Sequence, residues 1–227
     1  IDLSHALRTA DAPTSTYLYL ADNRGEMALA VSDMSICDRI SPSYLASQLP
    51  LLQNAQVVVA DTNIPQESLE FLAENCNVPL FIDPVSTIKA EKIRGILPGI
   101  HTLKPNALEA ELLSGVPIHG PEDTRQAAKK LLELGIHRVF ISMGGSGVCA
   151  AMGDKCVILP PLPGNRVNTT GCGDAFMAAL TWAYLEGMDL EHTALAGLAA
   201  GSIAMESPET INPALCAAAV KKRMNRR

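Results

Sequence analysis

The sequence predicts an α/β protein whose mostly parallel sheet is covered by helices on both faces. From about residue 42, short apolar strands alternate with helical patterns, which is the spacing of a parallel sheet with crossover helices. The expected strands are apolar on both faces, as in sheets that are buried from both sides. With 227 residues, 48% of them hydrophobic, the chain can form one substantial core. We therefore expect a single domain over residues 1–227, with its α/β core over 42–227.

The individual elements follow from turn and capping signals. Residues 14–33 alternate like a β-hairpin around the turn-rich tetrapeptide 22–25. Ser41 before Pro42 predicts the start of a helix, and Gly135 predicts the end of another. The core strands are expected at 56–60, 79–82, 101–103, 138–143, 147–151 and 155–159. The helices that follow the first of them are expected near 65–75, 88–97, 106–114, 121–135, 173–187, 190–206 and 213–224.

Composition excludes several classes of function. A net charge of −6 and 4% aromatic residues argue against a nucleic-acid binder, and we find no apolar run long enough to span a bilayer. Six scattered cysteines without CxxC pairs, and no signal peptide, argue against a disulfide framework or a zinc site and favour the cytoplasm. His101 and His137 lie beside apolar runs, so we interpret them as structural.

Residues 168–176 carry the strongest chemical signal. Gly171, Cys172 and Gly173 are small, so their backbone amides can crowd together where a buried helix begins. A helix N-terminus of this kind binds phosphate well. Asp174 stands at the same end, where it could accept a proton from an alcohol that attacks the phosphate. The alternative is an Asp that caps a helix after a glycine turn.

A second candidate lies just past the expected strand 101–103. Asn106 and Glu109 are three residues apart on an opening helix and face the same way. Their amide and carboxylate oxygens could hold hydrated Mg²⁺. The alternative is a capping box, in which the Asn caps the helix and the Glu returns to its backbone amide.

The third candidate is the glycine-rich segment 142–147, directly after a strand. Its glycines would let the backbone approach a nucleotide, although a tight turn between two strands explains them as well. Gly145 and Gly147 also fit a dinucleotide-binding fingerprint, but that fingerprint needs a following helix, and a strand is expected here. No Walker-type phosphate loop occurs. All three candidates follow strands, at the edge where open α/β sheets bind ligands, and together they form the parts of a phosphoryl-transfer site.

These segments resemble the PfkB sugar-kinase family. Residues 168–180 resemble its C-terminal signature, Asn106 and Glu109 are similar to its Asn-x-x-Glu magnesium motif, and 142–147 look like its nucleotide loop. The resemblance implies a ribokinase-like three-layer fold with a small β lid, formed here by 14–33. It also implies ATP and Mg²⁺ as cofactors.

The resemblance also implies residue roles. Asp174 would take the proton from a sugar 5′-hydroxyl, while the amides of Gly171, Cys172 and Gly173 would form an anion hole for the transferring phosphoryl group. Asn106 and Glu109 would hold the metal. The nucleotide would contact Ser142, Gly144, Gly145, Gly147 and Asn106.

Within the family, the likeness is greatest to the pseudouridine-kinase subfamily. Strings that read like it occur at 33–36, 59–64, 82–86 and 101–106. Another sugar or nucleoside kinase, for ribose or adenosine for example, and a non-catalytic module with the same fold remain alternatives. Asn63 is a candidate sugar contact, for which turn capping is the alternative.

The sequence also departs from the family pattern. Cys172 stands where the family usually has Ala, and we expect this to be tolerated. Asn168 stands where Asp is usual, near a monovalent-cation site of many members, so activation by K⁺ stays open. The family's first strand and its Gly-Gly-x-x-x-Asn segment have no counterpart here, so we expect the chain to be the later part of a longer protein. The expected partners are a small sugar or nucleoside and ATP, neither nucleic acid nor a membrane, and a second copy bound through the lid.

Overall fold

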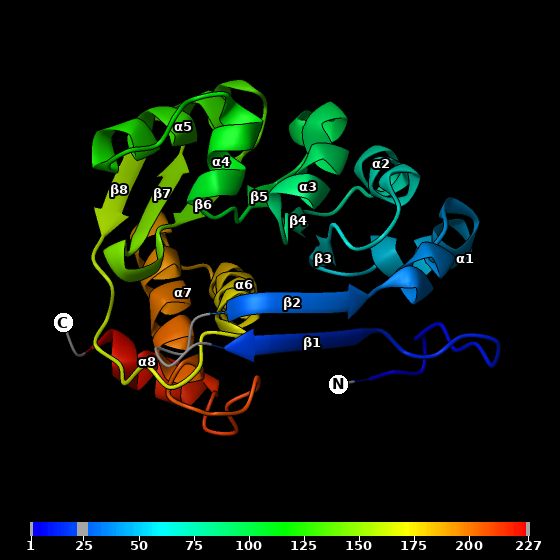
Figure 1. Ribbon diagram of the computed structural model, residues 1–227. Helices are drawn as coiled ribbons and strands as arrows, with labels where there is room; N and C mark the ends of the chain where they lie inside the picture. Colours follow the sequence, from blue (N-terminus) through cyan, green and yellow to red (C-terminus); the bar gives the residue numbers. More distant parts are fainter. Residues whose placement is uncertain (1, 22–26, 226–227) are drawn as a thin grey trace.

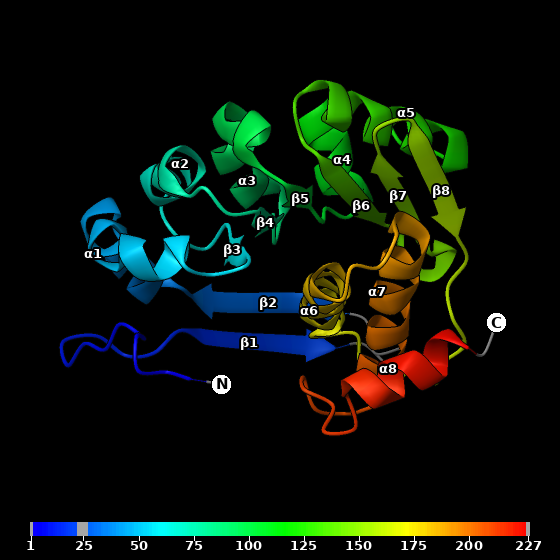
Figure 2. The same cartoon turned by 180° about the vertical axis from the view of Figure 1, so that it is seen from behind.

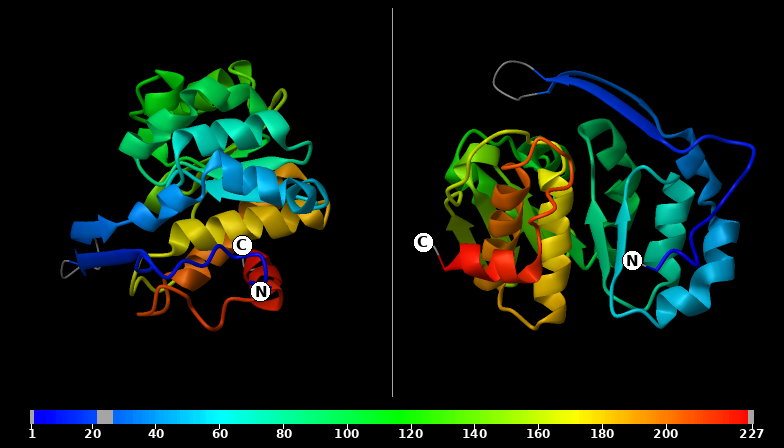
Figure 3. Two further views of the ribbon diagram at one scale, coloured as in Figure 1. Left: turned by 90° about the vertical axis from the view of Figure 1, so that its right-hand side faces the viewer. Right: turned by 90° about the horizontal axis from the view of Figure 1, so that it is seen from below.

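A computed structural model describes residues 2–21 and 27–225. The chain first forms an antiparallel hairpin of β1 (Thr16–Ala21) and β2 (Met27–Asp33), as the alternating pattern predicted. Leu18 pairs with Val31 and Leu20 with Leu29 across the two strands. The predicted turn at 22–25 lies outside the described residues. The hairpin runs outside the helix layers of the core (Figures 1 and 3).

The central sheet has the strand order β3-β4-β5-β6-β7-β8 within the described part of the chain. The first four strands are parallel to one another, whereas the last three form an antiparallel meander. Their bounds are β3 Val58–Asp61, β4 Leu80–Asp83, β5 Thr102–Leu103, β6 Arg138–Ser142, β7 Val148–Met152 and β8 Lys155–Leu159. All six strands lie within about two residues of the ranges that the sequence predicts.

Helices cover both faces of this sheet (Figures 1 and 2). One layer holds α1 (Pro42–Gln53), α2 (Gln66–Asn75), α3 (Thr87–Ala90), α4 (Ala107–Ser114) and α5 (Pro121–Glu133). The other holds α6 (Cys172–Leu185), α7 (Leu190–Ala204) and α8 (Ala217–Met224). Successive residues of β4 belong to two separate hydrophobic clusters, because their side chains point to opposite faces of the sheet. Phe81 packs with the second helix layer and Ile82 with the first. The sheet is therefore buried on both sides, as predicted.

Most helix ends follow the capping signals. The hydroxyl of Ser41 accepts a hydrogen bond from the Tyr44 amide, and Pro42 opens α1. Gly135, with φ 102°, follows the end of α5. After β5 the chain approaches α4 with Asn106 as its N-cap.

The prediction of one α-helix over 88–97 is wrong, because most of this segment is a 3₁₀-helix. An α-helical turn ends at Ala90, and the chain continues as a 3₁₀-helix, η2 (Glu91–Gly99). Pro98 explains the change, because its ring clashes with the carbonyl that an α-helix would place four residues earlier, and it has no amide hydrogen to donate. Ile93 and Ile96 are both buried, and a spacing of three suits the threefold repeat of a 3₁₀-helix.

The last helix begins later than predicted, at Ala217 rather than near 213. The Asn212 side chain accepts a hydrogen bond from the Ala214 amide, and its carbonyl accepts one from the Leu215 amide. An Asn that bonds its own following backbone favours a turn over a helix. This local turn delays the helix.

The two histidines singled out in the sequence are packed into the structure. The His101 ring stacks on Phe81 at 5.5 Å and on His137 at 4.7 Å between centroids. Burial, together with the nearby charges of His137 and Arg138, lowers the pKa of His101 to about 4. His101 is therefore neutral at pH 7, in keeping with a structural role. In the described part of the chain, no helix is long and apolar enough to cross a membrane.

Candidate active site

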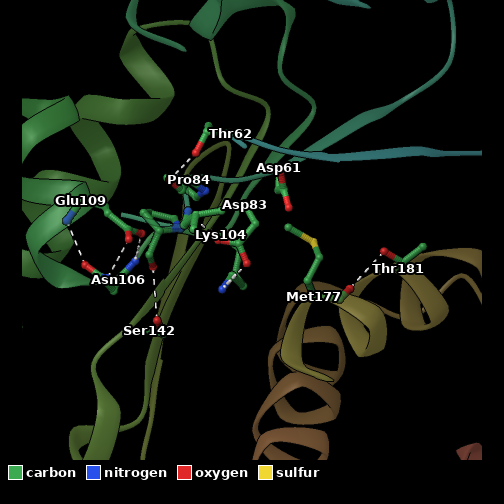
Figure 4. A network of polar contacts seen from close by, with 12 residues as sticks. Asp61, Thr62, Asp83, Pro84, Lys104, Asn106, Glu109, Ser142, Met177 and Thr181 are labelled. Atoms are coloured by element: carbon green, nitrogen blue, oxygen red, sulfur yellow. Dashed lines mark hydrogen bonds and ion pairs between the residues drawn. The ribbon is translucent and has the colours of Figure 1, made fainter. Parts of the chain in front are cut away.

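Polar side chains gather where the parallel strands end. Asp61 ends β3, Asp83 ends β4, Lys104 follows β5 and Ser142 ends β6. These strands run the same way, so their carboxyl ends meet at one edge of the sheet, facing α6, which carries Met177 (Figure 4). Ligands bind at this edge in open α/β sheets.

Lys104 is a buried cation at this edge of the sheet. Its ammonium lies 2.7 Å from the Asp83 carboxylate, and the residue is only 6% exposed. A Cβ atom at Gly173 would come within 3.2 Å of the Lys104 Nζ, so the cation lies directly against the first turn of α6. Lys104 is not among the site residues that the sequence predicted. The available signal was a lysine immediately after a buried strand, where burial of a charge is costly without a partner.

The first turn of α6 has the predicted glycine geometry. Gly171 is the N-cap with φ 85°, and a Cβ atom there would lie 2.3 Å from the Thr210 carbonyl oxygen, so a larger residue would not fit. The Cys172 amide donates to the Thr169 carbonyl at 3.3 Å. The next amides, of Gly173 and Asp174, belong to the first turn and have no acceptor within the helix. Of the predicted anion-hole amides, that of Cys172 is therefore engaged within the turn, while the Asp174 amide interacts with its own carboxylate.

Asp174 follows directly after Gly173 in this turn, and it is not itself among the residues that line the neighbouring cleft in the described part of the chain. Burial raises the pKa of Asp174 above its ordinary value, the carboxylates of Asp83 and Asp61 raise it further, and the Lys104 cation opposes them. A carboxyl group with a raised pKa beside a cation is a common arrangement for a proton acceptor in catalysis.

A cleft of about 600 Å³ lies between Lys104, the first turn of α6 and the glycine-rich segment. Of the predicted site residues, it is lined by Ser142, Gly144, Gly145, Gly147, Cys172 and Gly173. The cleft is also lined by three residues that the sequence did not predict for the site: Lys104, Arg166 and Phe176. Arg166 lies in the loop two residues before the 168–176 segment, but nothing in the pattern of that segment predicts that Arg166 lines the cleft.

The glycine-rich segment is both a tight turn and part of the cleft wall. It forms a short 3₁₀ turn, Gly144–Ser146, between the antiparallel strands β6 and β7. Gly147 has φ 95°, and a Cβ atom there would lie 1.9 Å from the Leu159 carbonyl oxygen. A strand follows this segment, so the rejection of the dinucleotide fingerprint is confirmed.

Asn106 and Glu109 form the capping box that the sequence analysis kept as an alternative. The Glu109 amide donates to the Asn106 side-chain oxygen, and the Glu109 carboxylate accepts from the Asn106 backbone and side-chain amides, at 2.8–2.9 Å. Burial, and then Asp83, raise the pKa of Glu109, while the bond from the Asn106 amide and Lys104 lower it. Asn106 lines a second cavity of about 540 Å³, which shares Ser142 and Gly144 with the cleft.

Glu109 is only 2% exposed, so a divalent cation would meet its carboxylate at a nearly buried position. Each of its oxygens accepts one hydrogen bond and keeps further acceptor capacity. Mg²⁺ prefers oxygen ligands and retains several waters, so Glu109 and Asn106 could hold it through its water shell.

Asn63 and Asn168 are both held by neighbours. The Asn63 side-chain amide donates to Asp61 at 2.8 Å, and its oxygen accepts from Lys89. The Asn168 oxygen accepts from the Thr170 amide at 3.0 Å and from the Tyr19 hydroxyl at 3.3 Å. The second bond ties the β1–β2 hairpin to the segment that leads into α6.

Several known proteins resemble this chain in sequence, in fold or in both. A model of the pfkB family of carbohydrate kinases matches residues 1–216. Pseudouridine kinase of Escherichia coli K12 is 42% identical over 209 residues, which are 91% of this chain and 67% of that protein. An uncharacterised sugar kinase of the same organism, YeiI, is 32% identical over 219 residues, 96% of this chain and 60% of that protein.

A solved structure agrees with the fold. The ribokinase of Arabidopsis thaliana, complexed with ribose and ATP, superposes with a TM-score of 0.77 at 24% identity, covering 93% of this chain and 69% of that one. The fold is therefore ribokinase-like, with a mostly parallel sheet between two helix layers, as the sequence predicted. The match over nearly the whole length shows that this chain belongs to the pfkB family of carbohydrate kinases.

Proposed function

We propose that the protein transfers a phosphoryl group from ATP to the 5′-hydroxyl of pseudouridine, with Asp174 as the base. The observation that carries this proposal is the placement of Asp174 on the first turn of α6, directly after the cleft-lining Gly173 and within the electrostatic reach of Lys104 and Asp83. The 42% identity to a pseudouridine kinase supports the choice of substrate. Asn63, beside Asp61 at the end of β3, is the proposed sugar contact.

The chemistry follows from the geometry. The glycine turn Gly144–Ser146 and Gly147 let the backbone approach the nucleotide, while the amides at the start of α6 and the Lys104 cation stabilise the charge of the transferring phosphoryl group. Asp174 accepts the proton that the attacking hydroxyl loses. Bound Mg²⁺, held by Asn106 and Glu109, would neutralise the phosphates of the nucleotide.

The test is ADP release from Mg-ATP by the natural polypeptide, with pseudouridine, uridine, adenosine and ribose offered in parallel, with and without K⁺. We expect selective turnover of pseudouridine. Turnover of another sugar or nucleoside instead would keep the kinase activity and contradict the substrate, and YeiI and a 31% identical ribokinase of Bacillus subtilis make that alternative concrete. No turnover of any acceptor would favour a non-catalytic member of the fold.

We also propose that the hairpin binds a second copy of the chain. Four apolar side chains on one face of β1 and β2 are 58–67% exposed, and they oppose one another in pairs: Leu18 with Val31 and Leu20 with Leu29. An exposed apolar patch of this kind marks an interaction surface. Light scattering should show a dimer that Leu18→Ser/Leu29→Ser makes monomeric, whereas Ile211→Ser, at an exposed site outside the hairpin, leaves it unchanged.

A further inference from the structure

A pair of cysteines lies in the sheet on the side covered by α5. Cys149 on β7 and Cys156 on β8 have their sulfur atoms 3.6 Å apart, in contact, although all six cysteines are free thiols. The strand register pairs Cys149 with Ile158 and Ala151 with Cys156, so the two cysteines are diagonal neighbours on one face. The bland interpretation is two small apolar residues in a core.

The surroundings of the two thiols differ. Cys149 is fully buried, whereas Cys156 is partly exposed. Arg125 on α5 places its guanidinium 3.7 Å from the Cys156 sulfur and donates to the Cys156 carbonyl at 3.1 Å. The hydrogen bond from the Cys149 thiol, and then Arg125, lower the pKa of Cys156 to about 6, while the same bond and burial raise the pKa of Cys149. Cys156 is therefore the thiolate, and Cys149 is a protonated thiol in contact with it.

We propose that Cys149 and Cys156 are a redox-active pair, which a hydroperoxide converts into an intramolecular disulfide. The Cys156 thiolate attacks the terminal oxygen of the hydroperoxide, the O–O bond breaks and a sulfenic acid forms, while the other oxygen leaves as an alkoxide or hydroxide that takes a proton from water. The Cys149 sulfur then attacks the Cys156 sulfur, and the hydroxyl of the sulfenic acid leaves with the Cys149 proton as water. The two thiols lose two electrons, which the hydroperoxide accepts.

The register sets the properties of this bond. A disulfide requires the sulfurs to approach to about 2.05 Å, and diagonal residues on adjacent strands stand farther apart than directly opposed ones. The strands must shift to close the bond, so we expect glutathione to reduce it readily, unlike a structural disulfide. Reactivity of this kind fits a reversible modification site.

Trypsin separates the two cysteines, which makes the test direct. Cleavage after Arg138, Lys155 and Arg166 gives peptide 139–155 with Cys149 and peptide 156–166 with Cys156. Purified protein is treated with a small excess of hydrogen peroxide, its free thiols are blocked with iodoacetamide, and the digest is analysed by mass spectrometry. We expect the two peptides to be joined, with a mass two hydrogens below their sum, and glutathione to separate them.

Variants make the result specific to the pair. Cys156→Ser should abolish the joined species and leave Cys149 unoxidised, whereas Cys216→Ser, at an exposed site on another element, should leave it unchanged. In the reduced protein at neutral pH, iodoacetamide should label Cys156 before Cys149, by on the order of tenfold in rate. The proposal is overturned if both peptides remain alkylated at a peroxide dose that already oxidises Cys216, or if Cys149 is labelled first.

Discussion

At the scale of single residues, the site depends on how charges balance around Asp174. Its carboxyl group lies near two other carboxylates, Asp61 and Asp83, and one cation, Lys104. The carboxylates favour its protonated form and the cation favours its ionised form. A base must be ionised to accept a proton, so this balance would set the pH at which Asp174 could act as the proposed base.

Asp174→Asn should lower kcat by about 10²- to 10⁴-fold, because it removes the proton acceptor. The affinity for ATP, measured by calorimetry, should stay near that of the unaltered protein. Asp154→Asn, in the exposed turn between β7 and β8, is the matched control and should leave kcat unchanged. Substantial turnover by Asp174→Asn would contradict the assigned role.

Lys104→Met should move the acidic limb of the kcat/KM profile to higher pH, because the pKa of Asp174 rises when its neighbouring cation is lost. Asp83→Asn removes a carboxylate and should move the limb the opposite way. Parallel pH–rate profiles of the two variants check both signs. An unmoved limb in both would mean that another group controls it.

At this scale, the glycines and acidic residues of the candidate site could be predicted from the sequence, whereas its cations could not. Gly171 and Gly147 were recognisable because only glycine fits where the backbone turns back against a carbonyl. Lys104 was in view but was given no role, because its significance depends on Asp83, which lies on a different strand. The sequence alone did not show that α6 would pack against both.

At the scale of elements, Gly147 fixes the junction between β6–β7 and the end of β8. Gly147→Ala should lower the free energy of unfolding by about 2 kcal/mol or more, because its φ of 95° and the Leu159 carbonyl at 1.9 Å both exclude a Cβ atom. Gly145→Ala, in the same turn with open space around it, should change it by less than about 0.5 kcal/mol. Urea denaturation compares the two, and equal losses would contradict this assignment of strain.

The start of α4 combines a helix cap with the proposed metal contact. Glu109→Gln should weaken the capping box by about 1 kcal/mol and raise the Mg²⁺ concentration for half-maximal activity by about tenfold or more. Glu111→Gln, on the same helix and bonded to the Ile118 amide, is the control and should leave the Mg²⁺ dependence unchanged. A loss of stability without a change in Mg²⁺ dependence would mean that Glu109 is a cap alone.

Element boundaries were predictable where one local signal dominated. Ser41 and Pro42 fixed the start of α1, but the region after α3 became a 3₁₀-helix through the combined effect of Pro98 and buried Ile93 and Ile96. That outcome depends on packing against α2, which the local pattern does not contain.

At the scale of the whole molecule, the sheet separates two cores that meet the site from opposite sides. The first layer supplies Asn106 and Glu109 at the start of α4, and the second supplies Asp174 at the start of α6. The hairpin is tied to the segment before α6 by the hydrogen bond from Tyr19 to Asn168. The proposed catalytic arrangement therefore requires both layers to be folded onto the sheet.

The change from parallel to antiparallel pairing at β6 has a consequence for how the chain folds. The meander β6–β7–β8 pairs neighbours in sequence, whereas β3, β4 and β5 pair only after an intervening helix has been brought across the sheet. Closing short loops costs less chain entropy than closing long ones, so the meander should form first. Pulsed hydrogen exchange should protect amides in 139–158 before those of β3, and the reverse order would contradict this. The glycine turn of the proposed nucleotide site would then be among the first parts of the protein to take shape.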